Sequence, residues 1–171
     1  MPIATPPPAL HVSEGLVSTL ARRVPSFRIE FANRFALRGL TPKGGYEIRF
    51  NEQQGEVRTT FLARGGNPLE HIQLISRTPA AQYDPPQIID SIVRNEEELP
   101  WVQKSVDAET GRRTVTVLPF GDAPNAPSVL VSTSASTGFV SINVEGANDL
   151  SPAEALLLAK ALAKAADLAA N

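Results

Sequence analysis

The stretch YEIRFNEQQGEVRTTF, residues 46–61, alternates apolar and polar side chains on both sides of a short polar loop. A period of two residues is typical of a β-strand that buries one face, and Gly55 suits the tight turn between two such strands. The stretch therefore predicts an antiparallel hairpin. Its outer face alternates Arg and Glu, so we expect Arg49 and Arg58 to form cross-strand ion pairs with Glu47 and Glu56, as Arg28 would with Glu30.

Upstream of this hairpin, the sequence predicts a helix and then a strand. Apolar residues between 16 and 24 recur at helical spacing, Ser13 is a candidate N-cap, and Pro25 would end the helix. From Phe27 the period changes to two, and the same face continues to Leu37, which predicts one long strand. Residues 1–10 hold four prolines, so we expect an extended arm that is either mobile or laid on a partner.

Downstream, the sequence predicts one ambiguous segment, two further helices and the four strands of two hairpins. Residues 67–76 fit a helix start or a strand, and the alternation within them favours the strand. A helix should begin at Asp84-Pro85-Pro86-Gln87 and end before Glu96, because the negative end of a helix disfavours anions. Hairpins are predicted at 101–106 with 113–118 and at 129–133 with 139–144, separated by a Pro-rich loop at 119–127. Ser151-Pro152-Ala153-Glu154 forms a capping box before a C-terminal helix.

These elements predict an α+β fold, mainly an antiparallel sheet built from hairpins and covered by about three amphipathic helices, including the C-terminal one. The length of 171 residues fits one domain over residues 11–171 after the arm. Its two halves, 11–80 and 81–171, repeat the same order of helix and strands. No residue-level repeat establishes a duplication.

Composition excludes several classes of protein. The chain has no cysteine, so disulfides, thiolate metal sites and cysteine nucleophiles are ruled out. No apolar run approaches the ~20 residues that span a bilayer, and the first residues lack the pattern of a secretory signal. We therefore expect a cytoplasmic protein that does not enter a membrane.

The C-terminal fifth of the chain carries a resemblance. It consists of the strand FVSINV (139–144), the segment LSPAEA (150–155) and an Ala/Leu-rich helix that reaches KAAD (164–167). This strand–turn–helix, about residues 138–170, resembles the tail of uncharacterised small proteins of actinobacteria and their phages. The resemblance implies such an origin and carries no activity or site residue with it.

Charge is distributed unevenly along the chain. Residues 1–80 hold ten Lys/Arg and six Asp/Glu, whereas residues 81–171 hold six and twelve. Six basic residues could gather where loops and helix ends meet at one end of the sheet, and Trp101 is a candidate apolar anchor. The candidate interaction residues are Arg22, Arg23, Arg34, Arg38, Lys43, Arg64 and Trp101.

No catalytic, cofactor or metal site is predicted. The only histidines, His11 and His71, have no second ligand at a recognisable spacing, and no serine lies in a nucleophile motif. The glycine pairs at 44–45 and 65–66 lie outside any phosphate-binding pattern. We therefore expect a non-enzymatic interaction or assembly protein that binds a protein partner or itself, and the resemblance of residues 138–170 allows it to be phage-encoded. The alternatives are a small-molecule or enzymatic pocket between sheet and C-terminal helix, and nucleic-acid binding through the basic half.

Overall fold

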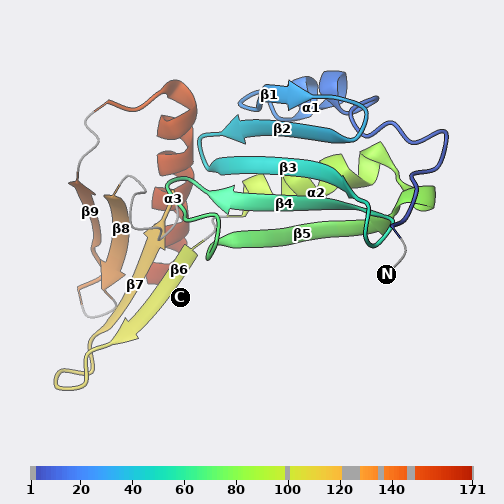
Figure 1. Ribbon diagram of the computed structural model, residues 1–171. Helices are drawn as coiled ribbons and strands as arrows, with labels where there is room; N and C mark the ends of the chain where they lie inside the picture. The colour runs from blue at the N-terminus through green and yellow to red at the C-terminus, as the bar shows by residue number, and fades with distance from the viewer. Residues whose placement is uncertain (1–2, 99–100, 121–127, 135–136, 146–148, 171) are drawn as a thin grey trace. The chain divides into compact units, whose positions relative to one another are not determined.

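A computed structural model describes residues 3–98, 101–120, 128–134, 137–145 and 149–170. The chain forms two compact units, Met1–Glu97 (unit 1) and Glu98–Asn171 (unit 2). Each unit combines an antiparallel sheet with at least one helix, which confirms the predicted α+β class (Figure 1). The boundary follows the second α-helix, so that helix belongs to the first sheet rather than opening the second half of the chain.

Unit 1 is a five-stranded meander with two α-helices. Its elements are α1 (Val17–Arg23), β1 (Arg28–Ala32), β2 (Ala36–Thr41), β3 (Gly44–Asn51), β4 (Glu56–Ala63), β5 (Ile72–Pro79), a 3-10 turn (Ala80–Gln82) and α2 (Pro85–Glu97). The strand order is β1-β2-β3-β4-β5, and every neighbouring pair is antiparallel. The predicted hairpin is confirmed as β3 and β4, with Gly55 at a φ of +63° in its turn.

Two predictions for the first forty residues are wrong. The stretch from Phe27 to Leu37 forms two strands, because the Asn33 side chain accepts hydrogen bonds from the N–H groups of Phe35 and Ala36 and turns the chain. Ser13 does not cap α1 with its side chain. Its carbonyl accepts the Leu16 N–H at 3.1 Å, and the helix begins at Val17.

The end of α2 also differs from the prediction, because the helix continues through Glu96 to Glu97. The Tyr46 hydroxyl donates to Glu96 at 2.6 Å and accepts from the Asn95 side chain at 2.8 Å. The Lys43 ammonium donates to the Asn95 carbonyl in the same turn. This cation offsets the negative end of the helix, which explains why glutamates are tolerated there. Burial, followed by the charge of Glu96, raises the pKa of Tyr46.

One face of the unit 1 sheet is covered by the helices, which lie behind it in Figure 1. Apolar residues of both helices are buried against apolar residues of the central strands. The principal members of this core are Leu20, Ile88, Ile89, Ile92, Tyr46, Ile48, Val57 and Phe61. No described helix of unit 1 covers the opposite face, which we call the open face.

Unit 2 is a four-stranded meander with one helix. It contains β6 (Trp101–Val106), β7 (Arg113–Leu118), β8 (Ser128–Ser134), β9 (Val140–Glu145) and α3 (Pro152–Ala170), in the strand order β6-β7-β8-β9. The two predicted hairpins are confirmed. So is the capping box, since the Glu154 N–H donates to the Ser151 hydroxyl and the Ser151 N–H to the Glu154 carboxylate. The predicted loop at 119–127 falls largely outside the described residues.

The helix of unit 2 packs on its sheet through small residues. Ala161 and Ala165 of α3 are fully buried against Val117 and Val131.

At the β6–β7 turn, the Asp107 carboxylate accepts the N–H groups of Glu109 and Thr110 at 2.9 Å each. Among the residues described in both units, no helix is long and apolar enough to cross a membrane.

Candidate functional site

The predicted basic residues do not form one cluster. Arg22 and Arg23 lie on α1, over the covered face, and Arg23 pairs with Asp90 of α2 at 2.6 Å. Arg64 follows β4, where its N–H donates to the Lys43 carbonyl. Of the predicted set, only Arg38 lies on the open face, opposite Glu47. Trp101 lies in β6, and its side chain is outside the described part of the structure.

Lys43 is not accessible to a partner. Its side chain is 1% exposed, and its ammonium binds the last turn of α2 and lies 5.8 Å from the centre of the Phe61 ring. A turn between two strands suggested an exposed lysine. The last turn of α2 covers this lysine, and a contact between segments so distant in sequence cannot be read from the residues around Lys43.

Arg34 binds the N-terminal arm of its own chain. Its Nε donates to the Leu10 carbonyl at 2.8 Å and its Nη2 to the Pro8 carbonyl at 2.5 Å. Farther along the arm, the Ala4 N–H donates to the Glu52 carbonyl at 2.6 Å. The described part of the arm therefore lies on unit 1, and Arg34 has a role within the fold.

A different set of arginines lies together on the open face. Cross-strand pairing places Arg49 of β3 opposite Arg58 of β4, and Arg58 opposite Arg77 of β5. We call these three residues the arginine row. Neighbouring strands are about 4.8 Å apart, so the three guanidinium groups extend from adjacent backbones in one line. Like charges directly opposite each other destabilise a sheet, and the row is an unfavourable arrangement unless carboxylates or a ligand compensate it.

Two carboxylates compensate the row in part. Glu47 pairs with Nε of Arg49 at 3.2 Å and with Nε of Arg38 at 3.9 Å. Glu56 pairs with Nε of Arg58 at 2.6 Å and with Nε of Arg77 at 3.3 Å. Each carboxylate is shared by two guanidinium groups, so this part of the face keeps a surplus of positive charge. Arg49 and Arg58 do pair with Glu47 and Glu56, but the prediction that these pairs cross between strands is wrong, because each pair joins residues two apart on one strand.

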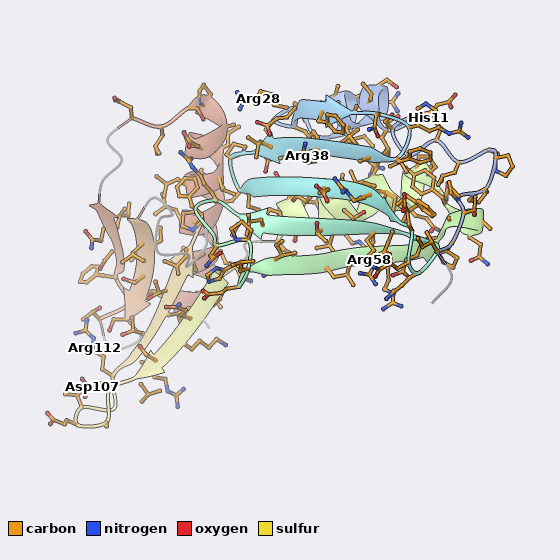
Figure 2. The ribbon with its side chains drawn as sticks, in the orientation of Figure 1. His11, Arg28, Arg38, Arg58, Asp107 and Arg112 are labelled. Carbon is orange, nitrogen blue, oxygen red and sulfur yellow. The ribbon has the colours of Figure 1, made fainter. Side chains whose placement is uncertain are left out.

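Aromatic side chains and a shallow depression adjoin the arginines. Phe31 is 38% exposed and Phe35 is 41% exposed, and the Arg38 guanidinium lies 5.1 Å from the centre of the Phe31 ring. Between them, Ala36 pairs with Arg49 and supplies a small side chain. The resulting depression has a volume of about 670 Å³, and its lining includes both phenylalanines, Arg38, Arg49 and Arg58. Figure 2 labels Arg28, Arg38 and Arg58 on this sheet.

Helix α2 of unit 1 carries the opposite charge, whereas α1, on the same side of the sheet, carries Arg22 and Arg23. Within α2, Asp90, Glu96 and Glu97 outnumber Arg94. Residues 81–97 hold four Asp/Glu and one Arg, and residues 98–171 hold eight Asp/Glu and five Lys/Arg, so unit 1 contains half of the acidic surplus of the second half of the chain. Asp90 and Glu96 are engaged by Arg23 and Tyr46, respectively.

Other chemistry is not indicated by the described residues. Within the described ranges, no group of three or more His, Asp or Glu side chains could hold a metal ion. His11 accepts the Glu14 N–H and His71 accepts the Asn67 N–H, each through Nδ1 at 3.1 Å. Both histidines thus complete local turns.

Comparisons with protein-family models, curated proteins and solved structures find no match. The functional argument therefore rests on the surface of unit 1, and the resemblance of residues 138–170 to actinobacterial and phage proteins stays a prediction.

Proposed function

We propose that this chain is a non-enzymatic docking protein that binds an acidic segment of a partner protein on the open face of unit 1. The observation that carries the proposal is the incomplete compensation of charge at the arginine row. The three arginines of the row and the neighbouring Arg38 share two carboxylates, those of Glu47 and Glu56. Carboxylates of a partner would meet the surplus charge, and an apolar side chain would enter the depression beside Phe31 and Phe35.

Arginine chemistry supports a carboxylate ligand. A guanidinium carries five N–H donors in a planar fork that matches a carboxylate, and each of the four ion pairs uses Nε. Glu47 and Glu56 also hold the guanidinium groups in place, which reduces the conformational entropy lost when a ligand binds.

Protein is favoured over nucleic acid as the partner. Glu47 and Glu56 lie within the arginine surface and would repel the closely spaced phosphates of a nucleic acid. An acidic peptide can instead place its carboxylates at the arginines and apolar side chains at the exposed phenylalanines.

A second copy of the chain is a weaker candidate for this surface. The acidic helix α2 would be its complement, but Asp90 and Glu96 are already bound by Arg23 and Tyr46. A partner that supplies uncommitted carboxylates fits better than a copy that must break these contacts.

The test uses the full chain and a fluorescein-labelled peptide of about ten glutamates with a central phenylalanine. The variant R49E/R58E reverses two charges in the arginine row, and R22E/R113E makes the same charge change at exposed sites on α1 and β7. Fluorescence anisotropy should show that the first variant weakens binding by tenfold or more, while the control stays near wild type. Binding should weaken as salt rises. Circular dichroism checks that both variants are folded.

Three results would overturn the proposal. Equal losses in both variants would show that net charge alone attracts the peptide. Tighter binding of an oligothymidylate of the same length, lost in R49E/R58E, would assign the face to nucleic acid. A wild-type mass by light scattering above the 18.3 kDa of one chain, restored to one chain in R49E/R58E, would assign it to self-association.

A further inference from the structure

The outer edge of β5 is open to pairing within unit 1. β5 is the last strand of the sheet, and β4 is its only strand neighbour among the described residues. It is eight residues long, contains no lysine, and places its one proline at its end. Ile72 and Leu74 are about half exposed on it. Natural sheet edges are commonly protected by short length, charge, proline or a bulge. β5 has one exposed charged residue, Arg77, and one irregularity, where its pairing shifts between Thr59 and Thr60, but it is not short.

The opposite edge of the same sheet is protected. β1 is five residues long, its pairing with β2 is interrupted by an irregularity between Ile29 and Phe31, and it carries the exposed ion pair of Arg28 with Glu30. β5 also carries an irregularity and an ion pair, so the two edges differ chiefly in length: the eight residues of β5, against five in β1, offer another strand the longer run of backbone groups.

A groove accompanies β5 on the helix side. It has a volume of about 530 Å³ and is lined by Ser76 and Thr78 of β5 and by Gln87, Ile88, Ser91 and Arg94 of α2. Side chains of an added strand would alternate between this groove and the open face, because successive residues of a strand point to opposite sides. An edge strand beside a helix thus offers both a backbone to pair with and space for alternate side chains.

Ser76 provides a polar group in this groove. Its hydroxyl is buried and makes no hydrogen bond within the described structure. Thr59 lies directly opposite on β4, and its buried hydroxyl likewise lacks a partner among the described residues. A buried hydroxyl without a partner is costly and uncommon in folded proteins, and a polar group of a ligand at Ser76 would remove part of that cost.

We propose that β5 accepts an extended peptide segment of another protein as a sixth strand, with alternate side chains of the peptide in the β5–α2 groove. A small polar side chain or a backbone group of the peptide hydrogen-bonds to Ser76. This site uses the outer edge of β5 and the helix side of the sheet. It adjoins Arg77, the one member of the arginine row that lies on β5, but it does not depend on the function proposed for the row.

A second copy of this chain is a poor occupant of the edge. Antiparallel pairing of β5 with its copy around a twofold axis would place both α2 helices on the same side of the joined sheet. Each α2 carries three carboxylates and one arginine, Asp84 and Glu98 flank it, and Arg23 of α1 pairs with Asp90 only. Repulsion between the two helices disfavours that dimer, whereas a single peptide strand brings no second helix.

The experiment selects a phage-displayed library of random dodecapeptides on the full chain, and the enriched peptides are then synthesised. Addition of such a peptide should slow amide hydrogen exchange in Ile72–Pro79. Replacing alternate peptide N–H groups by N-methyl groups should abolish binding, because a sixth strand needs main-chain hydrogen bonds. R49E/R58E should bind the peptides as wild type does, which separates this proposal from the first.

Side-chain variants test the groove. Ser76→Ala should weaken peptide binding by about three- to tenfold while leaving the melting temperature unchanged or higher, a combination that a purely structural role for the hydroxyl does not give. Ser91→Trp should block the groove, with Glu97→Trp as a matched control on the exposed last turn of α2.

The proposal is overturned if no peptide is enriched, or if the enriched peptides protect amides outside β5. Wild-type affinity in both Ser76→Ala and Ser91→Trp would also overturn it. So would a peptide-free dimer by light scattering that protects the β5 amides, since that would assign the edge to a second copy.

Discussion

Removal of one hydroxyl should destabilise unit 1, because the Tyr46 hydroxyl joins the sheet to the end of α2. Tyr46→Phe keeps the ring, whose centre lies 5.8 Å from that of Phe27 and 4.9 Å from that of Phe61. It removes the hydrogen bond to Glu96 and leaves the Asn95 side-chain amide without its acceptor. The change therefore tests polar contacts while the apolar packing is retained.

The expected loss of stability follows from these contacts. A hydrogen bond to a charged group contributes about 1.5–3 kcal/mol, and Glu96 is only half-buried, so the lower part of that range applies. An orphaned amide on Asn95 adds a smaller cost. We expect about 2 kcal/mol in total, which corresponds to a decrease of about 8–16 °C in the melting temperature of a unit of this size.

Urea and thermal unfolding of the full chain, followed by far-ultraviolet circular dichroism, measure this loss. Tyr83→Phe is the matched control, because its hydroxyl donates to the neutral carbonyl of Val12 and should contribute about 1 kcal/mol. A double-mutant cycle of Tyr46→Phe with Glu96→Gln should give a coupling energy of about 1 kcal/mol. A loss below about 0.5 kcal/mol for Tyr46→Phe would refute the view that this hydroxyl fastens α2 to the sheet.

Three further outcomes are expected. Arg34→Ala should release the N-terminal arm, seen as faster amide exchange at Ala4, while an unchanged rate would show that Arg34 does not hold it. Ser151→Ala should cost about 1 kcal/mol in unit 2, measured by Trp101 fluorescence during unfolding, and no change would contradict a working capping box. The pKa of Asp107 lies below its ordinary value of 3.8, because the N–H groups of Thr110 and then Glu109 favour the charged carboxylate. The stabilisation it gives the turn is therefore present above pH 3.8 and lost as pH falls through the lower pKa, so the Thr110 amide resonance should titrate below 3.8.

Local patterns in the sequence predicted most of the fold. Alternation around Gly55 gave the β3–β4 hairpin, and the Ser151 capping box gave the start of α3, because each depends on residues close in sequence. The failures depended on distant contacts or on one side chain acting on the backbone. The Asn33 side chain turns the backbone and so divides a stretch of sequence that alternates without interruption. Lys43 and Tyr46 bind the last turn of α2, which is distant in sequence, and so allow the helix to include Glu96 and Glu97.

The arginine row could be predicted only in part. The hairpin register follows from the turn at Gly55, so Arg49 and Arg58 could be placed opposite each other from sequence alone. The position of Arg77 opposite Arg58 could not be predicted from sequence. The pairing of β5 with β4 shifts between Thr59 and Thr60, and the bounds of β5 were ambiguous in the sequence. Ion pairing was expected for Arg49 and Arg58. The sharing of each glutamate by two arginines could not be predicted, because it depends on how neighbouring strands pair.

Both sheets pair each strand only with its neighbours in sequence. Contacts of this kind are local, so the loops that must close during folding are short and folding should be fast for a β-rich chain. The five-stranded sheet and both of its helices are complete by residue 97. During synthesis, unit 1 can therefore reach its native pairing while unit 2 is still being translated, and no strand has to wait, unpaired and open to aggregation, for a distant partner.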